Sequence, residues 1–137
     1  MIHGIIEILL DDANFVSKVG NGPGNTGKVY WVIAPQDAKI PYVILTTTGN
    51  NPNQNKDAPS TYDSPTFSAF VYAESPEQCD QIDVALRLAV EVKNVQTETI
   101  YFYRVYMINQ ADGYDREAQK VFRETSYGVL LKRPDIT

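Results

Sequence analysis

The sequence predicts an α+β fold, a mainly antiparallel five-stranded sheet with two helices packed on one face, in the order α-β-β-β-α-β-β. Three observations predict it. Apolar residues recur at helical spacing in two segments, β-branched and aromatic residues form five runs, and Gly, Pro or Asn separates most of these runs. Because short connections join successive strands, antiparallel pairing is expected. The chain has 137 residues, so residues 1–137 are expected to form a single domain.

The first element is expected to be an amphipathic helix over residues 2–19, with apolar residues three and four positions apart. Residues 20–27 contain four glycines and one proline, which should end the helix in a turn. This turn superficially resembles a phosphate-binding loop because glycines precede Lys28. Such a loop joins a strand to a helix and places Ser or Thr after the lysine. Here a helix precedes the turn and Val29 follows, which argues against phosphate binding.

Three runs rich in β-branched and aromatic residues, 28–33, 41–48 and 66–73, predict strands. Pro41 opens the second strand, where its missing N–H costs no interior ladder bond. Residues 49–65 contain four asparagines, three prolines and no aliphatic residue larger than alanine. They are therefore expected to form a long polar loop, able to project as an arm on the order of 25 Å.

The second helix is predicted by its start signal. Ser75 is placed to cap the free amides, Pro76 suits the first helical position, and Gln78 stands where a capping box closes. The expected buried stripe consists of Ile82, Ala85, Leu86, Ala89 and Val90. The side chains expected to point outward are Asp80, Asp83, Arg87 and Glu91.

The last two strands are expected over residues 99–108 and 121–131, joined by a polar stretch from residue 109 to residue 120. The first of them carries large side chains on both alternating faces, with Arg104 as the exception. Since the helices cover one side of the sheet, the other side is expected to expose Tyr101, Tyr103 or Phe70, depending on register. A large open apolar face of this kind marks an interaction site.

Composition excludes several classes of function. The net charge is −5, and the twelve Lys and Arg residues are scattered, which argues against tight nucleic-acid binding. The apolar N-terminal run has no basic leader and is broken by Glu7, so it is not expected to be a signal peptide. No stretch is long enough to span a bilayer, and Cys79 has no second cysteine for a disulfide. The protein is therefore expected to be made and folded in a reducing cytoplasm.

Residue types that carry chemistry are sparse. His3 is the one histidine and Cys79 the one cysteine. A zinc site would need further His or Cys ligands, and an activated thiol would need a neighbouring base or a second cysteine. Asp80 and Asp83 are interpreted as the solvated face of a helix. Asp112, Asp115 and Glu117 lack the ligand spacing of a calcium loop. No catalytic, metal or cofactor site is expected, and the protein is not expected to be an enzyme.

The order of elements resembles the tail-terminator, or tail-completion, proteins of long-tailed bacteriophages over nearly the whole chain. The resemblance is carried by a helix ending near Val19, a strand leading into residues 34–36, the run 40–44, a polar loop, a strand ending at residues 72–73, and residues 75–80 opening the second helix. The chain departs from that pattern in its longer turn at residues 20–27 and its Asn-rich loop at residues 49–61.

The resemblance implies a homo-oligomeric ring, usually of six subunits, in the virion. Such a ring sits at the head-proximal end of the tail, stops polymerisation of the major tail tube protein and docks the head–tail connector or head-completion protein. DNA would pass through an acidic lumen without specific binding, and no membrane contact is implied. A ring needs heterologous contacts between unlike surfaces. The expected subunit or tube contacts are Asn53, Asn55, Lys56, Asp57, Asp112, Asp115, Arg116 and Arg123.

Two alternatives remain open from the residues alone. Both polar stretches can be merely solvated, making no contact with a neighbour. The chain can also be a small cytoplasmic ligand-binding or regulatory α+β module, which predicts a small discrete oligomer and a concave apolar pocket.

Overall fold

A computed structural model describes residues 1–20, 28–35, 38–54, 59–98, 100–117 and 119–132, with backbone alone at residues 50–54 and 59–62. The helices are α1 (Ile2–Leu10), α2 (Ala13–Val19) and α3 (Pro76–Val90). The strands are β1 (Val29–Trp31), β2 (Tyr42–Gln54), β3 (Pro59–Ala73), β4 (Lys93–Gln96), β5 (Tyr101–Asp115) and β6 (Lys120–Lys132).

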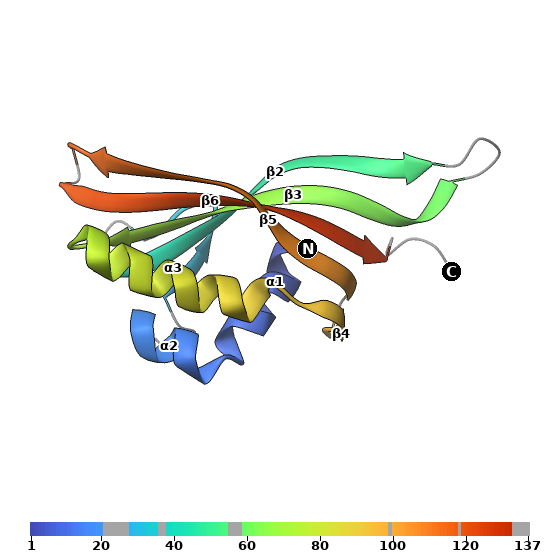
Figure 1. Cartoon of the computed structure of the whole chain (residues 1–137), viewed down its shortest axis with the longest axis horizontal. Coiled ribbons are helices and arrows are strands. Elements are labelled where there is room, and N and C mark those ends of the chain that lie inside the picture. The colour runs from blue at the N-terminus through green and yellow to red at the C-terminus, as the bar shows by residue number, and fades with distance from the viewer. Residues whose placement is uncertain (21–27, 36–37, 55–58, 99, 118, 133–137) are drawn as a thin grey trace.

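The strands form one curled sheet in the order β1-β2-β3-β6-β5-β4. The β1 strand runs parallel to β2, and every other neighbouring pair is antiparallel. All three helices lie on one side of the sheet (Figure 1). The α+β class, the mainly antiparallel pairing and the one-sided helices are thus confirmed. The element count is corrected to six strands and three helices in the described part of the chain.

The predicted first helix is two helices, because Asp12 caps a new one. The Phe15 amide donates to Asp12 Oδ1 at 2.9 Å, and Asp12 itself has extended backbone geometry. The apolar spacing was still informative within each half. It buries Ile5 and Leu9 of α1 completely, and Phe15 begins the buried face of α2.

In the polar segment 49–65, the described residues 49–54 and 59–65 are paired strands and not irregular loop; residues 55–58 lie outside the described part of the chain. Thr66 pairs with Gly49, Ser64 with Asn51, and the register ends at Pro59 opposite Gln54. In Figure 1 this β2–β3 arm extends past the helices at one end of the molecule. Backbone hydrogen bonding needs no apolar side chain. Strands whose two faces both meet solvent therefore lack the alternating pattern by which strands are recognised.

The β5–β6 hairpin was likewise underestimated. Residues 109–115, expected in a polar connection, continue β5 and pair with β6 as far as Asp115 opposite Lys120. The short strand β4 was missed, because four residues with one half-buried side chain carry no readable pattern. It covers β5 only as far as Arg104. From Tyr106 onward, the outer edge of β5 has no strand partner among the described residues.

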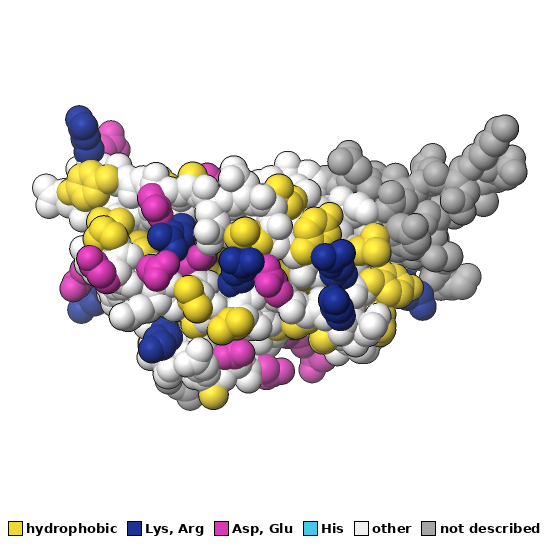
Figure 2. Space-filling model, viewed as in Figure 1, with side chains coloured by type: hydrophobic (Ala, Val, Ile, Leu, Met, Phe, Trp, Pro, Cys, Tyr) yellow, Lys and Arg dark blue, Asp and Glu magenta, His cyan; other side chains and the backbone are white. Residues whose placement is uncertain are grey.

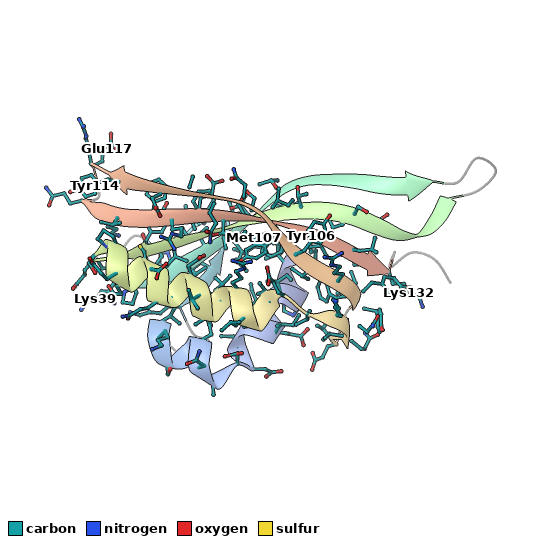
Figure 3. The ribbon with its side chains drawn as sticks, viewed as in Figure 1. Lys39, Tyr106, Met107, Tyr114, Glu117 and Lys132 are labelled. Carbon is teal, nitrogen blue, oxygen red and sulfur yellow. The ribbon has the colours of Figure 1, made fainter. Side chains whose placement is uncertain are left out.

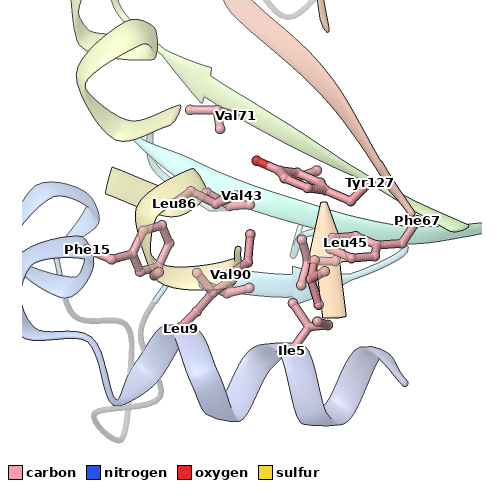
Figure 4. Packing of buried hydrophobic residues seen from close by; sticks show 14 of the residues in the cluster. Ile5, Leu9, Phe15, Val43, Leu45, Phe67, Val71, Leu86, Val90 and Tyr127 are labelled. Atoms are coloured by element: carbon pink, nitrogen blue, oxygen red, sulfur yellow. The ribbon is translucent and has the colours of Figure 1, made fainter. Parts of the chain in front are cut away.

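The hydrophobic core lies between the sheet and the helices (Figure 4). At its centre the rings of Phe67 and Tyr127 stack with centroids 5.1 Å apart. The predicted start of α3 is confirmed, since Ser75 Oγ accepts from the Gln78 amide at 3.2 Å. The Gln78 side chain accepts from the amide of Glu74 and not from that of the capping residue. The predicted α3 stripe is buried throughout.

Candidate assembly surfaces

An ion cluster on the helix side of the sheet is centred on Arg123 of β6. Its Nε donates to Asp112 Oδ1 of β5 at 2.7 Å, and its Nη1 donates to Asp80 Oδ1 of α3 at the same distance. The hydrogen bond with Asp112 is the main cause that raises the pKa of the Arg123 guanidinium. Arg123 is only 18% exposed at its side chain. One guanidinium therefore joins two strands to the helix that covers them.

Asp83 of α3 lies beneath this cluster and is 1% exposed, although the sequence pattern placed it in solvent. The Thr125 hydroxyl donates to its Oδ1 at 2.8 Å, and the Gln110 amide donates to its Oδ2 at 2.6 Å. Arg123 Nη1 is 3.7 Å from Oδ2. Burial raises the pKa of the Asp83 carboxyl, while the Thr125 and Arg123 contacts oppose that rise. The outward placement of Asp83 was therefore wrong.

A signal for the buried aspartate was present in the sequence. Cys79, Asp83, Leu86 and Val90 are spaced at four, three and four, so Asp83 lies on the same helical face as its apolar neighbours. The structure places all four on the buried side of α3. A carboxylate on a buried stripe requires partners, which here come from β5 and β6.

The predicted contact residues fall at three places. Asn53 belongs to β2 in the arm, where the backbone alone is described. Asn55, Lys56 and Asp57 lie outside the described residues. The other four residues are in or beside the β5–β6 hairpin, namely Asp112, Asp115, Arg116 and Arg123.

Within the hairpin, Asp112 and Arg123 face each other across the two strands and bind within one chain. Asp115 Oδ1 accepts from the Glu117 amide at 3.1 Å and shapes the turn. Arg116 is exposed. Pairing of any of these residues across subunits stays a prediction.

The helix-free side of the sheet, which we call the open face, carries a row of aromatic rings. Tyr30, Tyr42, Tyr72 and Phe122 follow one another from β1 to β6, with successive centroids 6.0, 5.1 and 5.6 Å apart. Lys120 Nζ lies 4.8 Å from the Tyr42 ring centroid and donates to its hydroxyl at 3.1 Å. The expected aromatic open face is therefore present, with different residues at its centre.

Two glycines of the open face lie under aromatic rings. A Cβ on Gly128 would be 2.4 Å from Cζ of Tyr106, and a Cβ on Gly113 would be 2.4 Å from Cζ of Phe122. Each ring therefore occupies the space that a side chain on the adjacent strand would fill, and glycine leaves that space open.

Grooves in the described part of the molecule are shallow. One of about 490 Å³ lies between α1 and β4. Its lining combines three acidic residues, Glu7, Asp11 and Glu98, with the polar Gln96 and Thr97 and the aliphatic Ile8, Leu10 and Val95. A more apolar hollow of about 200 Å³ involves Met1 and Trp31. It is smaller than the roughly 300 Å³ at which small-molecule sites begin. No group of three His, Cys, Asp or Glu side chains is placed to hold a metal ion within the described ranges.

The single cysteine and the single histidine lie where the sequence analysis expected them. Cys79 is buried, its thiol donates to the carbonyl of Val71 at 3.5 Å, and burial raises its pKa. It is thus a packed residue, as expected. His3 is exposed. In the residues that the structure describes, no helix is long and apolar enough to cross a membrane.

The architecture has two layers, one sheet and the helices that cover a single side of it. A similar fold is found among solved structures. No protein-family model matches the chain, and no curated protein matches it in sequence. The fold is similar to a chain of the virion of a native gene transfer agent particle, with a TM-score of 0.73 and 12% identity. The match covers 96% of this chain and 93% of that one. At this identity the likeness shows a shared fold over nearly the full length of both chains.

Proposed function

We propose that this protein is a structural component of a phage-like virion. The observation that carries the proposal is the fold shared from end to end with a chain of a gene transfer agent virion. Fold alone does not define function. The proposal is supported by the polar extended arm and by an aromatic sheet face that no helix covers. Both are features of proteins that act through contacts with other chains.

In its finer form, the proposal is a tail-terminator ring at the head-proximal end of the tail, with six subunits as is usual in the family that the sequence resembles. The ring stops growth of the tube and joins the tail to the head connector, and it has no enzymatic role. The negative net charge of −5 suits a lumen through which DNA passes without adhesion.

The β2–β3 arm, with Asn53 and the predicted residues Asn55, Lys56 and Asp57 beyond it, is the part proposed to reach a neighbouring subunit or the tube. At the other hairpin, Asp112, Asp115 and Arg116 are the proposed contact residues. Arg123 acts there by holding Asp112 in place.

The test is the mass of the purified protein by light scattering, alone and mixed with tail-tube protein, with negative-stain imaging of the mixture. We expect rings near six times the 15.4 kDa chain mass, or tubes capped at one end. A persistent monomer or dimer that neither binds tubes nor limits their length would contradict the proposal and favour the ligand-binding module.

A further inference from the structure

A groove at the edge of the sheet is basic, although the protein as a whole is acidic. It has a volume of about 310 Å³ and is lined by the end of α3, the start of β4 and the first half of β5. We call it the edge groove. Its charged lining residues are the basic Arg87, Lys93 and Arg104 and the acidic Glu91. Since the net charge of the chain is −5, positive charge is concentrated here against the overall balance.

The positive charges of the edge groove are only partly neutralised by the described residues. Arg87 Nε lies 3.0 Å from Glu91 Oε1, so the one acidic lining residue already has a partner. Lys93 and Arg104 form no ion pair with any other described residue, and both are exposed. Arg104 lies over the Tyr106 ring, 5.0 Å from its centroid. Two cationic side chains therefore remain available to an anionic partner.

Lys93 and Arg104 are also placed unfavourably for the isolated chain. They are register partners in the β4–β5 pair, so they lie directly opposite each other. Like charges in directly opposite positions of an antiparallel pair are destabilising. An anion bound between the two side chains would offset this repulsion.

The remaining lining of the edge groove is apolar and leads to a free strand edge. Val105 is buried, and Val92 and Met107 are partly buried against the core. The Val105 amide donates to the Val92 carbonyl at 3.0 Å. From Tyr106 onward, however, no described strand pairs with the outer edge of β5. The backbone groups along this edge can accept an added strand.

The edge groove lies on the side of the molecule seen in Figures 2 and 3. Figure 3 places Tyr106 and Met107 near the middle of the long axis. Figure 2 shows Lys and Arg side chains next to hydrophobic ones around the middle of this side. Tyr106 is 39% exposed, and Ile108, the next residue along β5 beyond the groove, is 52% exposed. A strand laid along β5 would thus meet basic side chains in the groove and an apolar one beyond it.

An extended acidic segment of a partner protein fits these features better than a nucleic acid does. A peptide in strand conformation supplies backbone groups for the free edge, and side chains on one of its faces can reach Lys93 and Arg104. A nucleic acid has no groups that continue a strand ladder. Its phosphates would also be repelled by a chain with a net charge of −5.

We infer that the edge groove binds an extended acidic segment of a partner protein, which pairs with the free edge of β5 and places carboxylates at Lys93 and Arg104. The inference goes beyond the proposed virion role and does not depend on a ring. A monomer that ignores tail tubes would still bind such a segment, so the two proposals can fail separately.

The first test uses three fluorescent peptides, with binding measured by anisotropy at low salt. The probe alternates threonine and glutamate. One matched control has glutamine in place of every glutamate, which removes the charge and keeps the strand pattern. The other has proline in place of every threonine, which keeps the charge and prevents strand pairing. We expect the probe to bind at least about tenfold more tightly than either control.

Variants of the protein locate the contact. Lys93→Gln and Arg104→Gln should each weaken binding of the probe by about two- to fivefold, and the double variant by about tenfold. Lys18→Gln, on the exposed side of α2 and outside the groove, is the matched control and should bind as the wild type does. All three side chains are exposed, so each variant should fold, which circular dichroism would check.

Hydrogen exchange tests the strand pairing itself. The bound probe should slow amide exchange in residues 106–108 and leave α2 unchanged. The inference is wrong if the wild type does not bind the probe at about 1 mM, where even weak contacts are populated. It is also wrong if the double variant binds as tightly as the wild type, or if the proline peptide binds as tightly as the probe.

Two other occupants would each give a different result. A single-stranded oligothymidylate of equal charge that binds more tightly than the probe, and loses affinity in the double variant, would assign the groove to nucleic acid. Self-association of the wild type in sedimentation, abolished in the double variant, would assign the groove to a second copy of this chain. Either result would overturn the inference.

Discussion

The helix-covered face of the sheet and its open face differ in how they use the same kinds of residue. On the covered face, Phe67 is fully buried against Tyr127, and a carboxylate is enclosed with three partners. On the open face, aromatic rings lie side by side; Tyr72 and Phe122 remain partly accessible, while Tyr42 is covered by its neighbours and by Lys120. Stability should therefore depend mainly on the covered face, which leaves the open face available for contacts that the single chain does not make.

The largest expected effect comes from two phenylalanines of β3. Phe67→Ala removes a fully buried ring and should lower the free energy of unfolding by about 3–5 kcal/mol. Phe70→Ala removes a half-buried ring packed on Phe122 and should cost about 1–2 kcal/mol. Urea unfolding of the two variants measures the difference. Equal losses would mean that the two faces contribute alike.

The next effect is expected at Arg123. Arg123→Met keeps the length of the side chain but removes both hydrogen bonds to Asp112 and Asp80 and leaves Asp83 with no nearby cation. We expect a loss of about 2–3 kcal/mol in unfolding free energy, measured by urea titration at neutral pH. Arg87→Met is the control, because the Arg87–Glu91 pair is exposed and should contribute under about 1 kcal/mol. Similar losses in both variants would contradict the proposed importance of the cluster.

A smaller effect should depend on pH. The folded protein raises the pKa of Asp83, so it holds this proton more tightly than the unfolded chain does. The stability contributed by Asp83 is then complete below the unfolded pKa of about 3.9 and is lost as pH rises through the folded value. Asp83→Asn lacks this dependence. The unfolding free energy of the variant, relative to wild type, should rise as the pH increases above about 4. A difference that stays constant as the pH increases would contradict the raised pKa.

The smallest effects concern two tyrosine hydroxyls. The hydroxyl of Tyr127 is buried and has no hydrogen-bond partner among the described residues, so Tyr127→Phe should stabilise the fold by about 0.5–1 kcal/mol. The hydroxyl of Tyr42 accepts from Lys120, so Tyr42→Phe should destabilise it by about 0.5 kcal/mol. Thermal unfolding of both variants would show opposite shifts. Shifts of the same sign would contradict this assignment.

Local chemistry made part of the fold predictable. The start of α3 was readable because Ser75 and Pro76 act within one turn, and its buried stripe followed from helical spacing alone. The arm was not readable as strands, since residues 50–54 carry no apolar alternation and depend on a partner strand for their hydrogen bonds. The break at Asp12 was missed because the apolar spacing continued across it.

The candidate surfaces were harder to predict from the sequence than the helices and strands were. The sequence predicted that Asp112 and Arg123 form ion pairs across subunits. Only the register of β5 with β6 shows that they face each other within one chain. The exposure of Trp31 and Ile33 could not be predicted, because it depends on which strand forms the edge of the sheet. Which strands pair, and which of them lies at the edge, depends on contacts between residues far apart in the sequence, so local patterns do not reveal it.

The ring of Tyr106 lies over Gly128, so a buried position and an exposed side chain are in direct contact. A single methyl group at residue 128, inside the sheet, would displace an exposed ring on the neighbouring strand without itself reaching the surface. An amino-acid exchange at an interior site can thereby reshape an outer contact. A substitution at residue 128 could therefore change which partners the open face binds, although no surface residue is replaced.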